Sequence, residues 1–299
     1  MSSSTPSAAD ALIGRIRRGI RQAGEAPDPV ARHAQFYRIA QALKAEILAF
    51  AAAESDDDAV LRCMRALHEE STAFKHAHAI ARLVYAPEVD MRYPFRDEAS
   101  NPVVVATLQQ FGRPDDGTRT YVADPVWPYL QADEASDARA MRYHSQIHCR
   151  AMLPTDLCDP REHALVGERG VFAVRDLEAG ACLGVYGGRL MNAATYYACI
   201  DPTFVLSTTV DGIESWIDGE NILAMANTAF AYEGERPARQ AGAGYNMEAA
   251  VFHALSRCGR RFAIRAFFTT EPVAAGTELR WNYHYPQALI RQRFGAQPA

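Results

Sequence analysis

The sequence predicts an α+β protein in which a mainly helical N-terminal region precedes a compact β-rich domain. Apolar residues recur at helical spacing through most of the first 83 residues. Beyond Val166, short apolar strands and Ala-Gly turns follow at close intervals, which is typical of a folded β domain rather than a parallel sheet with helical crossovers. No Gly-x-Gly-x-x-Gly follows a strand, so a Rossmann-type nucleotide site is not supported.

Length and composition indicate a globular chain of one large domain or two ordinary ones. The chain has 299 residues, of which 48% are hydrophobic and 22% are charged. The net charge of −5 argues against general binding to phosphate backbones, because such binding needs clustered cations. No apolar run reaches the length of a membrane span. We therefore expect no direct nucleic-acid contact and no transmembrane segment, and the oligomeric state stays open.

Three features bear on the cellular location. Lys44 and Lys75 are the only lysines, which suggests a GC-rich, bacterial genome. The six cysteines form no Cys-x-x-Cys pair and so resemble the reduced thiols of an intracellular protein. Residues 1–7 are small and polar and lack the apolar core of a Sec-type signal. The chain is expected either in the cytoplasm of a bacterium or exported into a host cell as an effector.

Residues 1–26 are predicted to be a flexible N-terminal segment that carries a short basic amphipathic helix. Leu12, Ile16 and Ile20 have helical spacing, and arginines stand between them. Such a helix either docks on the body of the protein or touches a membrane or an acidic partner.

Residues 27–150 are predicted to form a mainly helical region. Helical spacing continues from Val30 to Ala53, and Ser55–Asp58 can cap a second helix that runs on to Leu83. The signal is mixed after that. We expect a strand at Val103–Val105, a turn at Pro114–Gly117 and a short helix at Asp133–Tyr143.

A cluster of histidines and cysteines between residues 144 and 163 is a candidate metal site. His144 and His148 would share one face of a helix, as zinc ligands can. The spacings match no familiar zinc pattern, and a structural site would need four committed ligands. We expect no metal site. The remaining members of the cluster are Cys149, Cys158 and His163.

Two segments of the C-terminal half share one pattern. Phe172–Leu183 and Phe262–Leu279 each contain a short apolar strand, a turn with Ala-Gly and another strand. Glycine at the turn permits the positive φ that a tight connection needs.

Four blocks between residues 165 and 286 resemble, in the family's order, the SET-domain family of S-adenosylmethionine-dependent protein-lysine methyltransferases. Gly167–Ala173 resembles the opening strand that lies along the cofactor. This implies that Glu168, Arg169 and Gly170 contact S-adenosylmethionine. Val185–Gly188 resembles the aromatic-x-Gly segment near the lysine channel, and so implies that Tyr186 lines the channel and takes part in catalysis.

The third block, Trp216–Gly219 followed by Asn221–Ala229, resembles the family's Asp-Ala…Gly-Asn-x-x-Arg-Phe-x-Asn-His-Ser run. It implies that Asn227 and Thr228 bind the cofactor. The chain departs from the pattern at three positions, where the family has arginine, histidine and serine. These positions are Ala224, Thr228 and Ala229.

The fourth block, Ala275–Tyr285, resembles Ala-Gly-Glu-Glu-Leu-x-Phe-Asp-Tyr-Gly-Tyr and is the most specific of the four. Its resemblance implies that Tyr283 is the catalytic tyrosine and that Trp281 and Tyr285 line the substrate channel. Asn282 replaces the family's aspartate.

The resemblance implies a SET domain over residues 151–299, with a knot-like C-terminal segment, a short C-terminal extension and no cysteine-rich zinc segments. The function it implies is methylation of protein lysine side chains, with histones among the candidate substrates and no metal required. The alternative is an inactive SET-like module that binds a protein partner. That alternative is motivated by Thr228, Ala229 and Asn282.

Overall fold

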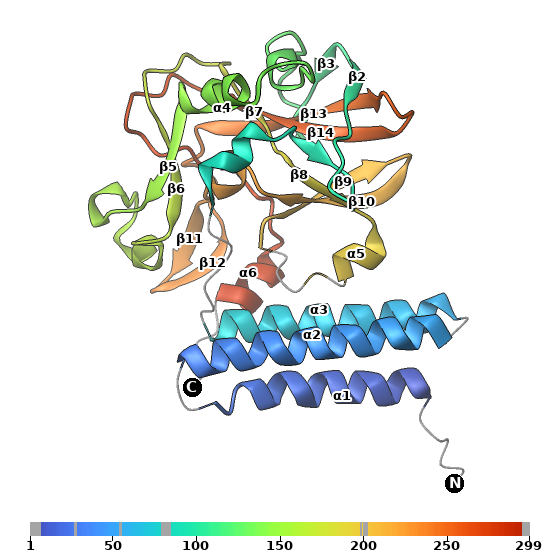
Figure 1. The fold of residues 1–299 in the computed structure, drawn as a ribbon. Coiled ribbons are helices and arrows are strands. Elements are labelled where there is room, and N and C mark those ends of the chain that lie inside the picture. Colours follow the sequence, from blue (N-terminus) through green and yellow to red (C-terminus); the bar gives the residue numbers. More distant parts are fainter. Residues whose placement is uncertain are drawn as a thin grey trace. The chain divides into compact units, whose positions relative to one another are not determined.

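The computed structural model describes residues 7–26, 29–53, 56–78, 85–197, 199 and 203–294. The chain divides into two compact units (Figure 1). The helical unit comprises residues 1–83, 192–203 and 297–299, and the β unit comprises residues 84–191 and 204–296. The protein is therefore α+β, with a helical N-terminal part and a β-rich C-terminal part.

Three long helices form the core of the helical unit: α1 (Ala8–Ala23), α2 (Pro29–Ala53) and α3 (Asp57–Ala77). The chain enters α1 through a capping box, in which the Ser7 hydroxyl accepts from the backbone of Asp10. The apolar stripe of α1 is buried against α2 and α3, with Ile16 fully inaccessible. The predicted amphipathic helix thus docks within its own unit.

The last segment of the helical unit comes from far along the chain. The short helix α5 (Ala193–Tyr197) lies against α3. The rings of Tyr196 and His68 are 4.7 Å apart, and the guanidinium of Arg65 lies 5.0 Å above the ring of Tyr197. The start of α3 follows the predicted cap, since the Asp56 carboxylate accepts from two backbone amides. The predicted continuation to Leu83 falls mostly outside the described residues.

The β unit is built on a curled sheet with the order β1-β8-β10-β9-β14-β13-β2, and β7 also pairs with β14. Two long antiparallel strands, β13 (Met247–Ser256) and β14 (Arg261–Thr269), form its centre. They contribute Phe252, Phe267 and Phe268 to the largest fully buried side chains of the core. The other strands of the sheet are β1 (Phe95–Arg96), β2 (Val105–Leu108), β7 (Cys182–Val185), β8 (Gly188–Met191), β9 (Val205–Val210) and β10 (Ile213–Gly219).

Three small two-stranded sheets and several short helices surround this sheet. The small sheets are β3 (Phe111–Gly112) with β4 (Tyr121–Val122), β5 (Ile147–Ala151) with β6 (Arg169–Ala173), and β11 (Phe230–Glu233) with β12 (Arg236–Gln240). The helices are η1 (Pro87–Met91), η2 (Trp127–Tyr129), α4 (Ser136–His144), η3 (Pro154–Asp156), η4 (Pro160–Leu165), η5 (Ile222–Met225) and α6 (Gln287–Phe294).

Residues 85–150 differ from the mainly helical region predicted over residues 27–150. They contribute β1 and β2 to the large sheet, and the long helices end at Ala77. The turn at Pro114–Gly117 is confirmed, because the Gly117 amide donates to the Pro114 carbonyl at 2.9 Å. His144 ends α4, whereas His148 lies on β5, so the two do not share a helix face.

The closing segment, defined as residues 278–283, runs between two other parts of the β unit. On one side the Leu279 amide donates to the Val171 carbonyl of β6 at 2.7 Å. On the other side the Trp281 amide donates to the Asn227 carbonyl at 3.1 Å. This insertion brings three of the four sequence blocks together.

Among the described helices, none is long and apolar enough to cross a membrane.

Candidate active site

The side chain of Asn227 joins the three segments that meet at the closing segment. Its amide nitrogen donates to the Arg169 carbonyl at 3.0 Å and to Glu278 Oε1 at 2.8 Å. We call this meeting point of residues 168–170, 226–228 and 278–280 the junction. The structure thus brings together the predicted cofactor residues Arg169, Gly170 and Asn227.

Gly170 is packed closely at the junction. A Cβ atom there would lie 2.5 Å from the Met152 sulfur and 3.1 Å from Glu278 Oε1, so a larger residue at this position would require the Met152 side chain to move. Glu168 has an exposed side chain, and its carbonyl accepts from the Met152 amide. The first block therefore supplies backbone to the junction.

Thr228 is tied to the neighbouring hairpin. Its hydroxyl oxygen accepts from Gln240 Nε2 at 2.5 Å. The same Gln240 amide lies 2.8 Å from the Ala229 carbonyl and 2.7 Å from the Tyr245 hydroxyl. Thr228 is buried, so its side chain anchors the loop before β11.

The predicted channel residues form one aromatic cluster. Ring centroids are 4.9 Å apart for Phe267 and Trp281, 4.9 Å for Trp281 and Tyr283, and 5.2 Å for Tyr283 and Tyr285. Tyr186 joins through Phe267 at 6.2 Å. Although these residues come from separate segments of the sequence, they share one apolar wall.

The aromatic cluster meets the junction at the hydroxyl of Tyr283. This hydroxyl donates to the Ala226 carbonyl at 2.5 Å. Ala226 immediately precedes Asn227, so the hydroxyl and the carbonyl present two oxygen atoms beside the junction. Tyr283 is only partly buried.

Tyr186 is held as a neutral phenol at the other end of the cluster. Its hydroxyl donates to the Phe204 carbonyl at 2.6 Å. Burial, together with the nearby Tyr283 and Tyr285, raises the pKa of Tyr186 well above its ordinary value. A Cβ at Gly219 would overlap the Tyr186 ring, so this ring packs directly against the backbone of Gly219.

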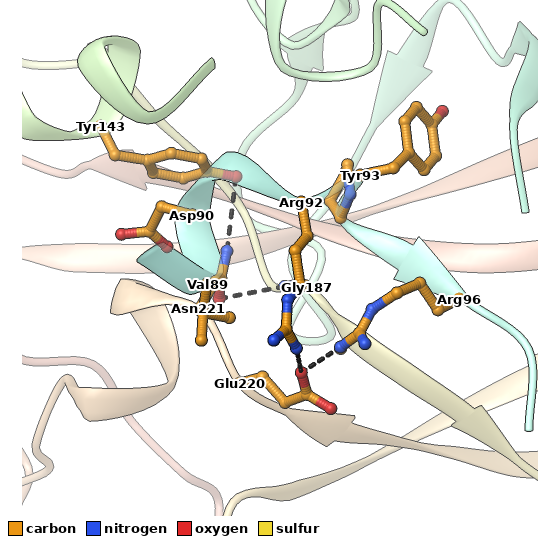
Figure 2. A pocket seen from close by; sticks show the side chains of 11 residues that line it. Val89, Asp90, Arg92, Tyr93, Arg96, Tyr143, Gly187, Glu220 and Asn221 are labelled. Atoms are coloured by element: carbon orange, nitrogen blue, oxygen red, sulfur yellow. Dashed lines mark hydrogen bonds and ion pairs between the residues drawn. The ribbon is translucent and has the colours of Figure 1, made fainter. Parts of the chain in front are cut away.

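Figure 2 shows a small pocket lined in part by Gly187, the residue after Tyr186, and by Asn221. The side-chain amide of Asn221 donates to the Val185 carbonyl at 2.7 Å, and its oxygen accepts from the Gly187 amide at 3.1 Å. The same side chain lies 3.3 Å from the Tyr143 hydroxyl. Asn221 therefore fixes both neighbours of Tyr186 in the chain.

Sequence reasoning missed a buried group of charges beneath the junction. Arg280 pairs with Glu278 at 2.5 Å and with Glu162 at 2.7 Å, and all three side chains are almost inaccessible. Burial raises the pKa of the Glu278 carboxyl, although Arg280 opposes this effect. Only the position of Arg280 between Leu279 and Trp281, both core residues, could have signalled this group.

The histidine weighed as a metal ligand has another role. His144 Nε2 lies 2.8 Å from Asp90 Oδ2, and the Tyr85 hydroxyl also donates to this carboxylate. Asp90 Oδ1 accepts from the Ile222 amide at 3.0 Å, which ties η1 to η5. Within the described part of the chain, no group of three or more His, Cys, Asp or Glu side chains could hold a metal ion.

No family model and no curated protein matches the chain. Among solved structures, a similar chain belongs to "ctPRC2 in an autoinhibited conformation bound to S-adenosylmethionine". The match has a TM-score of 0.32 and 17% identity, and it covers 58% of this chain. The chain spans 19% of the length of that one. A TM-score of this size does not assign a family.

Proposed function

We propose that the β unit is an S-adenosylmethionine-dependent methyltransferase that acts on lysine side chains of proteins. The observation that carries this proposal is the contact of the Tyr283 hydroxyl with the Ala226 carbonyl, where the aromatic cluster meets the junction. The ordered resemblance of four sequence blocks to the SET-domain family supports it. The first, third and fourth blocks meet at the junction, and the second block supplies Tyr186 to the aromatic cluster.

The residues at the junction fit a sulfonium cofactor. A sulfonium methyl group is electron-poor and favours contact with oxygen atoms. The Tyr283 hydroxyl and the Ala226 carbonyl supply such oxygens. We propose that Glu168, Arg169 and Gly170 hold the cofactor with backbone groups, and that Asn227 and Thr228 border it.

The aromatic cluster suits a lysine side chain that must lose its proton before it reacts. A lysine ammonium has a pKa of about 10.4 and no free electron pair. An apolar wall built from Trp281, Tyr186 and Tyr285 disfavours the charged ammonium by desolvation. When bound, S-adenosylmethionine would supply the methyl group that the neutral lysine amine accepts.

Tyr283 orients the reacting groups in this proposal. Its hydroxyl is already directed toward the Ala226 carbonyl, so it needs little reorganisation to meet developing charge. The neutral Tyr186, fixed by Asn221 on both sides, keeps the opposite wall in place. Positioning supplies most of the rate in such a site.

A protein substrate with an exposed lysine follows from this chemistry, and histones are a candidate because they are rich in lysine. The alternative is a SET-like module that binds a protein without methylating it. The hydrogen bond from Gln240 to the buried Thr228 hydroxyl favours that alternative, because it commits this side chain to the loop before β11 rather than to a cofactor. The proposed place of action is either the cytoplasm of a bacterium or a host cell into which the protein is exported.

The proposal is tested by incubating the full chain with isotopically labelled S-adenosylmethionine and an array of lysine peptides that includes histone tails. Mass spectrometry of the array should show labelled methyl groups on lysine. An array in which every lysine is replaced by arginine is the matched control and should stay unlabelled. If the protein binds peptides but no lysine is labelled, the binding module replaces the enzyme.

A further inference from the structure

The guanidinium of Arg280 is among the largest fully buried side chains of the β unit. Its Nε donates to Glu278 Oε2 at 2.5 Å and its Nη1 donates to Glu162 Oε1 at 2.7 Å. These donors lie on different edges of one planar group, so the two carboxylates are oriented relative to one another.

Stability alone does not explain this arrangement. Three charges are taken out of water, and apolar residues of similar size would fill such a space at no loss of stability. Moreover, within the described residues, Arg280 Nη2 and Glu162 Oε2 are buried without a hydrogen-bond partner. Desolvation and incomplete pairing of this kind motivate the hypothesis of a role in orientation.

Glu278 connects Arg280 to Asn227, because each of its two carboxylate oxygens accepts a hydrogen bond from one of these residues. Oε2 accepts from Arg280, and Oε1 accepts from the Asn227 amide at 2.8 Å. The Asn227 amide also donates to the Arg169 carbonyl. A rotation of the Glu278 carboxylate would therefore break its hydrogen bond with the Asn227 amide and leave that amide with the Arg169 carbonyl.

The backbone of Arg280 is fixed as well. Its amide donates to Asn246 Oδ1 at 3.0 Å, and its carbonyl accepts from the Met247 amide at 3.2 Å. Arg280 also forms a parallel bridge with Asn227. Because the Arg280 backbone is fixed, its guanidinium can hold the Glu278 carboxylate in one orientation.

We propose that Arg280 is a positioning residue, which through Glu278 and Asn227 fixes the spacing between the Arg169 backbone and the Ala226 carbonyl. Glu162 holds Arg280 in place from the other side. The effect on cofactor binding rests on the proposed function, whereas the effect on the Asn227 side chain does not.

The test removes all three charges at once. The variant Glu162→Leu/Arg280→Met/Glu278→Gln leaves no unpaired buried charge and keeps an oxygen that can accept from Asn227, so it is expected to fold. Hydrogen exchange of the Asn227 side-chain amide is followed by nuclear magnetic resonance, and its signal is assigned by its loss in Asn227→Ala. We expect exchange about tenfold faster, which corresponds to one weakened hydrogen bond.

Calorimetry with S-adenosylmethionine gives a second readout. We expect the dissociation constant of the triple variant to be about 10- to 100-fold higher than that of the wild-type protein. The matched control is Arg142→Met/Glu134→Leu, which removes an ion pair of the same unit that does not touch the junction. It should leave both readouts unchanged. Absence of cofactor binding by the wild-type protein would contradict the proposed function, while the amide exchange would still decide the role of Arg280.

Unchanged exchange of the Asn227 amide in the triple variant would overturn the proposal. If that variant fails to fold, Glu162→Gln decides instead, since it keeps an acceptor for Arg280 and removes one charge. We then expect exchange of the Asn227 amide to rise about threefold, a fraction of one hydrogen bond. No rise would overturn the proposal.

Discussion

At the scale of residues, the site depends on a few polar atoms in an apolar wall. The Tyr283 hydroxyl reaches the Ala226 carbonyl, and Asn227 joins two segments with a single amide group. Each of these groups can be altered without removing the ring or the backbone around it. Single substitutions therefore separate chemistry from folding.

Replacing Tyr283 with phenylalanine removes one hydroxyl and keeps the ring contacts with Trp281 and Tyr285. Loss of a preorganised group of this kind lowers rates by about 10²- to 10³-fold. Stability should fall by only about 1 kcal/mol, the net contribution of one hydrogen bond. Single-turnover transfer of labelled methyl groups and urea unfolding measure the two effects.

Tyr121→Phe is the control for that substitution, because it removes a hydroxyl that donates to Glu248 and keeps a ring stacked on Phe268. It should retain the full rate. Equal loss of rate in both variants would show that Tyr283 has no special part in the chemistry.

The raised pKa of Glu278 gives stability a defined dependence on pH. Burial raises this pKa, so the folded state binds a proton that the unfolded state releases near its ordinary value of 4.5. The unfolding free energy must then fall as pH rises from 4.5 through the raised pKa. Each unit of difference between the pKa of Glu278 in the folded and the unfolded state corresponds to about 1.4 kcal/mol of unfolding free energy.

Glu278→Gln lacks this titration. Urea unfolding of both proteins over a pH series should show the variant gaining stability relative to the wild type as pH rises through that window. A constant difference between the two proteins would contradict the burial of an ionisable Glu278.

At the scale of elements, close backbone approach places the tyrosine of the second block. Gly187 and Gly188 follow Tyr186 directly, and Gly188 pairs with Gly219 where β8 meets β10. The carbonyl of Asp218 fills the space that a side chain at Gly188 would need. The spacing of β8 and β10 therefore depends on the absence of this side chain.

Gly188→Ala should separate these strands and lower the unfolding free energy by about 1–3 kcal/mol, the usual effect of overpacking. Gly242→Ala is the matched control, since nothing lies within 4 Å of a Cβ atom there. Its effect should stay within about 0.5 kcal/mol. Urea unfolding measures both, and equal effects would contradict the close approach.

At the scale of the whole molecule, the two units have separate hydrophobic cores. The core of the helical unit is made by α1, α2 and α3, and that of the β unit by the curled sheet and its surroundings. All three tryptophans, Trp127, Trp216 and Trp281, belong to the β unit. Tryptophan fluorescence therefore reports on one unit, and far-ultraviolet circular dichroism reports mainly on the long helices of the other.

Ile16→Ala should destabilise the helical unit alone. Ile16 is completely inaccessible, and truncation of such a residue costs about 2–5 kcal/mol. We expect the denaturation midpoint by circular dichroism to fall while the midpoint by fluorescence stays in place. Coincident shifts of both midpoints would contradict independent cores.

The sequence predicts the long helices well, because their apolar spacing and caps are local signals. It also predicts which residues meet in the aromatic cluster, through the order of the four blocks. The strand predicted at Val103–Val105 meets β2 only at Val105, and β1 is not predicted, since both strands are short and are stabilised by pairing with distant strands. The sequence also does not predict the Arg280–Glu162 ion pair, because the two residues are 118 positions apart in the chain.

Hydrogen-exchange mass spectrometry of the full chain, with and without S-adenosylmethionine, tests the central claim most directly. Our account predicts that the cofactor protects backbone amides of residues 168–172, 226–228 and 278–283, and that the remaining amides of the β unit change little. Protection that is absent, or that falls on the residues of Figure 2 near Arg92 and Arg96, would contradict it.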